Sequence, residues 1–251
     1  MTRRRYLHIG TSGWHYRHWQ DSFYQGLPAS QWLPCYSRQF NTVEVNASFY
    51  RDTPVSTQEQ WITSTPADFR FTIKGHRYIT HVRRLRDIGD AVLREKSTYL
   101  AMQDKLIAVV WQLPSSFHID KTRLETFCMD LQQWPQVRHA IEFRHSSWFT
   151  QGTADCLRSY RVAVCQSDAA DWPMWDAVTS DLVYIRLHGH SHTYQSSYSS
   201  RLLSIWAQKI RQYLSQDHDV MVYFDNDAAG AAPRDALRLQ QEIDTAARTS
   251  T

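Results

Sequence analysis

Short runs of β-branched and aromatic residues recur along the whole chain, and stretches with helical spacing separate them. Four of the glycines fall close behind such runs, where a tight exit from a strand needs freedom in φ. The pattern predicts eight strands, at Tyr6–Ser12, Thr42–Asn46, Phe69–Lys74, Ile107–Leu113, His139–Arg144, Val162–Ser167, Leu182–His188 and Val220–Asn226.

The segments between these runs carry recognisable helix starts. The sequence Ser56-Thr57-Gln58-Glu59, just after a proline, has the pattern of a capping box and predicts a helix that ends near Ser64. Asp120 precedes apolar residues at positions 124, 127, 128 and 131, which share one helical face. Because parallel strands need crossover connections, eight strands alternating with helices predict a single (β/α)8 TIM barrel over residues 1–251. An open, doubly wound sheet is the alternative.

Side chains alternate between the two faces of a strand, so the apolar positions identify the face that packs against helices. Val43 and Val45 then face outward, and the same rule turns polar side chains inward at the carboxyl ends of several strands. Barrel enzymes keep their active sites at that end. The inward residues are Ser12, Glu44, Asn46, Lys74, Gln112, Glu142, Arg144, Arg186, His188 and Asp225.

This inward set contains three acids and three strong bases. Burying charges is costly unless they are paired, so the six can form an internal salt-bridge lattice. They can equally form a functional site, and for any single residue both roles stay open. For the set as a whole we favour a site, because it lies at the rim that barrel enzymes use.

Several short motifs run in order along nearly the whole chain. They are Ile9-Gly10-Thr11-Ser12-Gly13-Trp14, Phe40-Asn41-Thr42-Val43-Glu44-Val45-Asn46, Phe49-Tyr50, Ile79-Thr80-His81, Gln112-Leu113-Pro114, Glu142-Phe143-Arg144, Ser147-Trp148-Phe149, Arg186-Leu187-His188-Gly189 and Tyr223-Phe224-Asp225-Asn226-Asp227. Together they resemble the barrel proteins called domain of unknown function 72, the YecE-like family. The resemblance implies a TIM barrel, distantly similar to the xylose isomerase and endonuclease IV group, and implies no particular reaction. The family pattern leads us to expect Asn where this chain has Asp225.

Several features point to an anionic, hydroxyl-rich substrate, such as a phosphorylated one. The segment Lys74–Arg86 carries seven basic or potentially basic side chains and leaves the third predicted strand at the rim. A guanidinium fork, as in Arg144 and Arg186, suits a carboxylate or a phosphate. We also expect substrate contacts from the remaining rim residues, namely Ser12, Trp14, Asn46, Gln112, Tyr194, Tyr198, Asp225 and Asn226.

Acid–base chemistry is the reaction type that these residues favour, as in a hydrolase, lyase or isomerase. Two carboxylates in one cavity push their pKa values apart, so Glu142 is our candidate general acid or base, with His188 as proton shuttle. Lys74 is a candidate electrostatic stabiliser, or a Schiff-base amine if it is desolvated. Glu44 is either a fourth catalytic group or only the partner of Lys74 or Arg186.

Composition and missing motifs narrow the classes further. The 251 residues are 42% hydrophobic with a formal net charge of +3, which excludes a disordered chain. The four cysteines show no zinc spacing, no apolar run is long enough to span a membrane, and no signal peptide is evident, so we expect a cytoplasmic protein. The zincin, Walker and dinucleotide fingerprints are missing, so we expect neither metal nor cofactor.

Two other functions remain open at this point. The basic segment and the aromatic residues of the rim would suit a nucleic-acid-binding or nucleic-acid-processing protein, with phosphates on the basic side chains and bases stacked on the rings. A non-catalytic ligand-binding protein is the third reading. The sequence indicates no oligomeric state.

Overall fold

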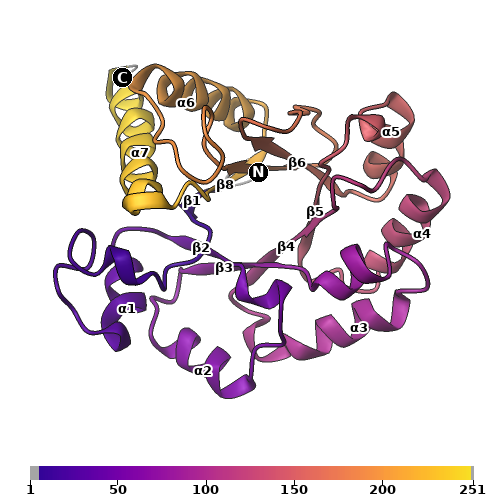
Figure 1. Cartoon of the computed structure of the whole chain (residues 1–251), viewed down its shortest axis with the longest axis horizontal. Coiled ribbons are helices and arrows are strands. Elements are labelled where there is room, and N and C mark those ends of the chain that lie inside the picture. The colour runs from indigo at the N-terminus through magenta and orange to yellow at the C-terminus, as the bar shows by residue number, and fades with distance from the viewer. Residues whose placement is uncertain (1–5, 250–251) are drawn as a thin grey trace.

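The eight hydrophobic runs form eight parallel strands in one sheet, and a computed structural model describes residues 6–249 of the chain. Each strand pairs with the next one along the chain from β2 to β8, and β8 pairs with β1, so the sheet curls into a barrel with helices around it (Figure 1). The strands are β1 (Leu7–Thr11), β2 (Thr42–Val45), β3 (Arg70–Lys74), β4 (Leu106–Gln112), β5 (Arg138–Glu142), β6 (Ala163–Asp168), β7 (Leu182–Leu187) and β8 (Asp219–Phe224).

Helices fill most connections between the strands, as parallel pairing requires. The exception is β6 to β7, which are joined by the irregular segment 169–181. The α-helices are α1 (Trp32–Tyr36), α2 (Val55–Thr63), α3 (Gly89–Thr98), α4 (Lys121–Leu131), α5 (Gln151–Ser159), α6 (Ser200–Ser215) and α7 (Ala231–Thr249). Short turns of 3-10 helix are η1 (Arg17–Trp19), η2 (Ala29–Gln31), η3 (Ala47–Phe49), η5 (Leu100–Met102), η6 (Ser146–Trp148) and η7 (Ala228–Gly230), and η4 (Tyr78–Val82) is one π-helical turn.

The predicted alternation of side chains holds in the strands and separates two cores. The outward residues pack with the helices in a large apolar core that includes Val43, Val45 and Ile185. The barrel interior is a smaller cluster, which contains Tyr184 and Tyr223. In β6, where the pattern was ambiguous, Ala163 and Cys165 face inward. The members of the interior cluster are Ala108, Val110, Ala140, Ala163, Cys165, Leu182, Tyr184, Met221 and Tyr223.

Side chains close the seam between β1 and β2, where only one strand bridge, Ser12 to Glu44, joins the two. The Tyr36 hydroxyl accepts the Thr11 N–H at 2.9 Å and donates to the Thr42 carbonyl at 3.1 Å, so a phenol stands in for the missing ladder bonds. Gly10 permits this approach, because a Cβ there would clash with the Thr42 carbonyl. The seam therefore closes at the end of the barrel where Ser12 and Glu44 lie.

One prediction about helix ends is wrong and another is confirmed. α2 begins at Val55 after Pro54, and no side chain caps it, so Ser56 lies inside the first turn and forms no capping box. The helix starts earlier because proline already has the φ that a helix entry needs. Asp120 caps α4 as predicted, with its side chain accepting the Arg123 N–H at 3.1 Å.

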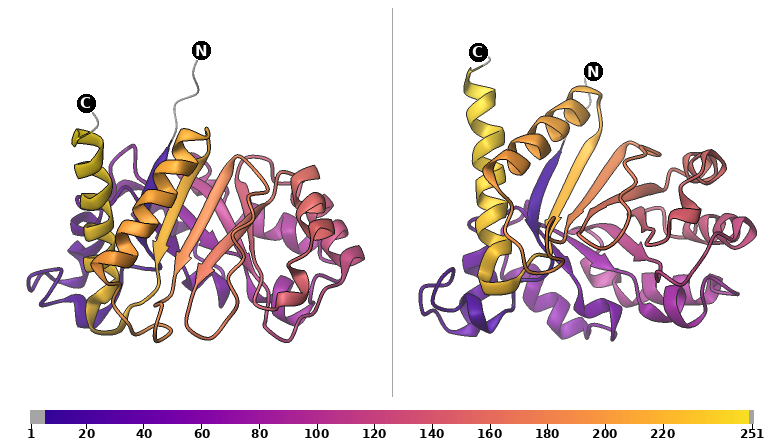
Figure 2. Two further views of the ribbon diagram at one scale, coloured as in Figure 1. Left: turned by 90° about the horizontal axis from the view of Figure 1, so that it is seen from above. Right: turned by 45° about the horizontal axis from the view of Figure 1, so that its top comes forward.

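All eight strands run the same way, so their carboxyl ends meet at one rim, toward which the arrowheads in Figure 2 point. The long helices α6 and α7 pack side by side against β8 and β1 at the seam side of the barrel. Within residues 6–249, no helix combines the length and the apolar character needed to cross a bilayer.

Candidate functional site

Arg186, near the end of β7, lies at the centre of a buried ionic network at the rim. Its side chain is fully buried, and its guanidinium contacts three carboxylates. Nη2 lies 2.8 Å from Glu44 Oε1 and 3.1 Å from Asp225 Oδ2, and Nη1 lies 2.6 Å from Glu142 Oε2. The arginine thus ties β7 to β2, to β5 and to the end of β8. Since its donors are directed at protein acceptors, Arg186 has little capacity left to bind a substrate.

Glu44 is the most completely bonded acid of this network. It is fully buried at the middle of β2 and accepts hydrogen bonds from Ser12 Oγ and from the Tyr184 hydroxyl, each at 2.6 Å, in addition to Arg186. Ser12 directly follows β1, whereas Tyr184 and Arg186 reach Glu44 from β7, which does not pair with β2. Glu44 therefore has the contacts of a structural partner of Arg186, one of the two roles that the sequence left open.

Glu142, at the end of β5, is also fully buried and is held by two arginines. Arg144 Nε donates to its Oε1 at 2.7 Å, while Arg186 Nη1 donates to Oε2. Burial opposes ionisation of this carboxyl, but the two guanidiniums outweigh burial and hold the pKa of Glu142 well below its usual range. Glu142 is therefore an anion at neutral pH and a weak proton acceptor.

His188, directly after β7, is fully buried between two carboxylates. Its Nδ1 lies 3.0 Å from Asp225 Oδ2 and its Nε2 lies 3.5 Å from Glu142 Oε1. Trp172 and Tyr194 cover the ring edge-on, with centroids 5.0 and 5.6 Å from that of His188. The two acids orient the imidazole, and the aromatic rings separate it from solvent.

Lys74, at the end of β3, is the rim base that lacks an acid partner. Its Nζ lies 4.3 Å from the centre of the Phe49 ring, and no carboxylate among the described residues forms an ion pair with it. Burial and then the positive charge of Arg186 lower the pKa of Lys74 to about 8. A desolvated amine of this kind loses its proton near neutral pH, which makes it available for proton transfer.

Polar atoms without partners surround this part of the rim. Arg144 stacks on Trp172, with its guanidinium carbon 3.3 Å from the ring centre, and its buried Nη2 donates to no atom of residues 6–249. Asn46 Oδ1, Trp172 Nε1 and Asp168 Oδ2 are likewise buried without a hydrogen-bond partner. Buried polar groups in proteins are nearly always bonded, so this cluster has the donors and acceptors to receive a polar ligand.

The other predicted binding residues mostly hold the rim together. Trp14 packs edge-on against Trp61 at 5.1 Å. The Tyr198 hydroxyl accepts the Gly189 N–H at 3.1 Å, and Asn226 Nδ2 donates to Asp235 at 2.8 Å. Gln112 Nε2 donates to a neighbouring backbone carbonyl, Tyr194 takes a positive φ beside His188, and Ser12 bonds to Glu44 as described above.

Some of the basic side chains in the segment that follows β3 already pair with other groups of the protein. Arg83 pairs with Asp87 at 3.2 Å, and Arg84 donates to the Ser116 carbonyl at 2.7 Å. Burial and then Lys74 lower the pKa of His81 to about 4, so this imidazole is neutral at physiological pH. The nucleic-acid interpretation of the segment stays a prediction. Within the described residues, no group of three His, Cys, Asp or Glu side chains is arranged to hold a metal ion.

Trp172 is the site residue that the sequence reasoning missed. It comes from the irregular connection 169–181, which the strand pattern leaves between β6 and β7. The one signal available was local: two tryptophans within five residues, beside a proline, in a loop that begins at the rim. Such aromatic residues pack loops more often than they contact ligands.

Comparisons with known proteins agree with this fold. The family model described as "Protein of unknown function DUF72" matches residues 8–251. The UPF0759 protein YunF of Bacillus subtilis is 26% identical over 95% of this chain and 95% of its own length. The UPF0759 protein YecE of Escherichia coli is 29% identical over 58% of this chain and 51% of its own length.

Solved structures show the same architecture. A DUF72 family protein from Thermotoga maritima superimposes with a TM-score of 0.85 at 25% identity, over 96% of this chain and all of that one. A DUF72 family protein from Enterococcus faecalis gives a TM-score of 0.82 at 18% identity, over 95% of each chain. These likenesses establish the barrel, and they carry no reaction with them.

Proposed function

The chain belongs to the DUF72 family of proteins of unknown function, and we propose that it is an enzyme with its active site at the carboxyl-terminal rim of the barrel. Its substrate is a small anionic molecule that bears hydroxyl groups, such as a phosphorylated sugar or a hydroxy acid. Arg144 and Lys74 attract the negative charge, and Lys74 and His188 transfer protons. The reaction is acid–base chemistry without a resident metal or cofactor.

The observation that carries this proposal is the unpartnered amine of Lys74. A partly buried cation without a counter-ion is costly, and this one lies beside a network in which three acids pair with two arginines. An anionic substrate would supply the missing charge. Nearby, within the part of the chain that the structure describes, Arg144 Nη2 is a buried donor without an acceptor and Asn46 Oδ1 is a buried acceptor without a donor. A hydroxylated anion would satisfy both.

The ionic network divides the rim residues by role. Arg186 and Glu44 have their hydrogen bonds filled by protein groups, so they position the site. Glu142 fixes Arg144 and lies beside His188, and it acts through those two groups. Asp225 orients the His188 ring from the other side. This division moves the proton-transfer role from Glu142 to Lys74, because the pKa of Glu142 is lowered and that of Lys74 is close to neutral.

Lys74 can act in two ways, and its desolvation favours both. As a general base it accepts a proton from the substrate. As a nucleophile it condenses with a substrate carbonyl to form an imine and release one water. Sodium borohydride separates the two, because it reduces an imine to a stable secondary amine and leaves a free lysine unchanged. A mass increase on the peptide containing Lys74, in the presence of a carbonyl substrate, identifies the nucleophile.

Anion binding at the rim is the first thing to test, with inorganic phosphate as the probe. We expect calorimetry to detect phosphate binding to the wild-type protein, and Arg144→Met to weaken it at least about tenfold, equivalent to about 1.4 kcal/mol. The control is Arg158→Met, which removes an exposed arginine on α5 far from the rim. Equal phosphate affinity in all three proteins would contradict the proposal.

Turnover is tested next, on a panel of sugar phosphates and hydroxy acids. We expect activity to depend on Lys74 and to rise with pH through about 8, where the free amine forms. Saturable binding of such a compound without any conversion would instead favour a non-catalytic ligand-binding protein.

A further inference from the structure

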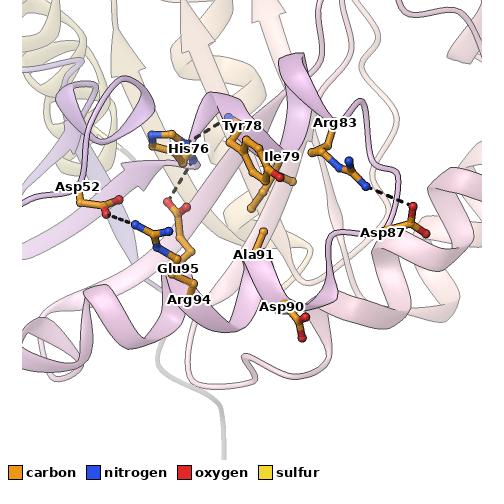
Figure 3. A pocket seen from close by; sticks show the side chains of 10 residues that line it. All are labelled: Asp52, His76, Tyr78, Ile79, Arg83, Asp87, Asp90, Ala91, Arg94 and Glu95. Atoms are coloured by element: carbon orange, nitrogen blue, oxygen red, sulfur yellow. Dashed lines mark hydrogen bonds and ion pairs between the residues drawn. The ribbon is translucent and has the colours of Figure 1, made fainter.

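A cavity lies outside the rim site, between α3 and the segment that follows β3. It has a volume of about 570 Å³ and is drawn in Figure 3. Its walls come from three stretches of chain that meet here: the loop before α2, the segment 76–88 and the first two turns of α3. The lining residues are Asp52, His76, Tyr78, Ile79, Arg83, Asp87, Asp90, Ala91, Arg94 and Glu95.

The charges that line this cavity do not cancel. Arg94 pairs with Asp52 at 3.1 Å and Arg83 pairs with Asp87 at 3.2 Å, so both guanidiniums already have a counter-ion. Two carboxyls remain without an ionic partner among the described residues, those of Asp90 and Glu95. The cavity therefore offers acidic groups to a ligand, although the whole chain has a formal net charge of +3.

Glu95 is the most unusual group of the lining. Its side chain is 93% buried, because only 7% of the residue's surface is exposed, and its carboxyl accepts one hydrogen bond, from the His76 N–H to Oε1 at 3.1 Å. No donor among the described residues reaches Oε2. Burial, with a smaller contribution from the charge of Asp52, raises the pKa of Glu95 to about 8. This carboxyl is a half-satisfied group that lies against a cavity.

The two acids lie on either side of an apolar strip. In Figure 3, Ala91 lies between Glu95 and Asp90, and Ile79 faces Ala91 from the opposite wall. Both acids belong to α3, five residues apart, so their backbones lie about 7.5 Å apart along the helix axis and about 140° apart around it. The Tyr78 ring borders the same cavity and offers a π-face to a cation.

We propose that this cavity binds a short aliphatic diamine or polyamine. One ammonium pairs with Glu95 in the interior, the methylene chain lies along Ile79 and Ala91, and the second ammonium pairs with Asp90 near the surface. A monoamine satisfies only one of the two acids, and an anion meets a surplus of carboxylates. The charge of the lining and the spacing of its acids thus define the ligand class.

The backbone beside the cavity departs from regular helix and turn geometry. The segment 76–88 contains the π-helical turn η4 and three residues with positive φ, Arg84, Leu85 and Asp87. None of the three is a glycine, and strained backbone of this kind is common where a protein holds a ligand. The same segment carries His81, which contacts Phe49 on the rim side, so one strained loop separates the two sites.

Proton release distinguishes this ligand from others. At pH 7 Glu95 is largely protonated, because its pKa is about 8, and an ammonium beside it would ionise it. Binding should therefore release close to one proton, and affinity should rise between pH 6 and pH 8 as that proton becomes easier to remove. The other titratable or charged groups around Glu95 are Asp52, His76, Tyr78, Arg83, Asp87, Asp90, Arg94 and Tyr99.

Calorimetry of the full chain with 1,4-diaminobutane, in two buffers of different ionisation enthalpy, tests the proposal. We expect Glu95→Gln to weaken binding at least about tenfold and to abolish proton release, since Gln keeps the bond from His76 but cannot ionise. Asp90→Asn should weaken the diamine severalfold and leave proton release intact, and butylamine should bind more weakly than the diamine.

The matched control is Asp21→Asn, which removes one exposed carboxylate outside the cavity and should leave affinity unchanged. Three results would overturn the proposal: no binding of the diamine at millimolar concentration, binding that Glu95→Gln and Asp90→Asn both leave unchanged, or equal loss in Asp21→Asn. Circular dichroism of each variant confirms that the fold is kept, and if Glu95→Gln fails to fold, Asp90→Asn carries the test alone.

Discussion

The charged groups of the rim divide into a closed region and an open one. Around Arg186, each guanidinium nitrogen has an acid partner, and Glu44 and Glu142 are fully buried and fully bonded. At the end of β3, the Lys74 amine has no acid partner among the described residues, and several buried polar atoms there have no hydrogen-bond partner. Both regions come from polar residues at the carboxyl ends of strands, so residue type alone does not distinguish a structural ion from a candidate reactive group. The hydrogen-bond and ion-pair partners of each group distinguish the two.

Breaking the closed region should have the largest effect. Arg186→Met leaves three buried carboxylates without their common counter-ion, and we expect it to lower the free energy of unfolding by about 3–5 kcal/mol. Urea unfolding measures this. Arg144→Met is the comparison, because Glu142 keeps Arg186, so its loss should be clearly smaller. Equal losses in the two variants would contradict the division.

Acid should weaken the closed region before the open one. The pKa of Glu142 is lowered in the folded protein, so this group stabilises the fold above the unfolded-state pKa and loses that contribution as pH falls through and below about 4. We expect the melting temperature of the wild type to fall steeply there. Glu142→Gln should start from a lower stability at pH 7 and show a shallower acid slope. An unchanged slope would show that Glu142 is not the group concerned.

Substitutions in the open region should reduce ligand binding and turnover and leave the free energy of unfolding nearly unchanged. Lys74→Met removes a desolvated amine that has no acid partner, so we expect the free energy of unfolding to change by less than about 1 kcal/mol, or to rise. Phosphate binding and turnover should be lost. Lys74→Arg keeps the charge but cannot lose its proton near neutral pH, so it should retain binding and lose turnover. A large loss of stability in Lys74→Met would place Lys74 in the closed region.

The smallest expected change in stability concerns two asparagines at the rim, whose side chains differ in their hydrogen bonds. Asn46 Oδ1 has no hydrogen-bond partner among the described residues, whereas Asn226 Nδ2 donates to Asp235 at 2.8 Å and to the Ser196 carbonyl at 3.0 Å. We expect Asn46→Ala to change the free energy of unfolding by less than about 0.5 kcal/mol, and Asn226→Ala to cost about 1–3 kcal/mol. Thermal unfolding of the pair checks this, and a reversed order would contradict it.

Most of the fold was predictable because its signals are local and periodic. Alternation placed Glu44, Glu142 and Arg186 inside the barrel, and the pairing of strands confirmed it. The closure of the seam was not predictable, since the Tyr36 hydroxyl reaches Thr11 and Thr42 from a helix, and no periodic pattern encodes that contact. The predicted capping box does not form because the helix starts two residues earlier, directly after Pro54.

The site was predictable as a set of residues but not as a division of roles. Sequence alone indicated that acids and bases would meet at the rim, yet the pairing of Arg186 with three acids depends on distances across the barrel. Because those three acids pair with Arg186, none of them is left to pair with Lys74. The stacking of Trp172 on Arg144 depends on a loop that has no periodic pattern. The Glu95 cavity was also hidden, because each of its acids reads as an ordinary helical surface residue.

The most direct test of the central claim is the titration of Lys74 by NMR. The chain has five lysines, so selective labelling of their side chains gives few signals, and Lys74→Arg assigns the one of interest. We predict a pKa of about 8 for Lys74 in the free protein and an upward shift when phosphate is added, because an anion stabilises the charged amine. An ordinary pKa near 10.5 that phosphate does not move would contradict the account.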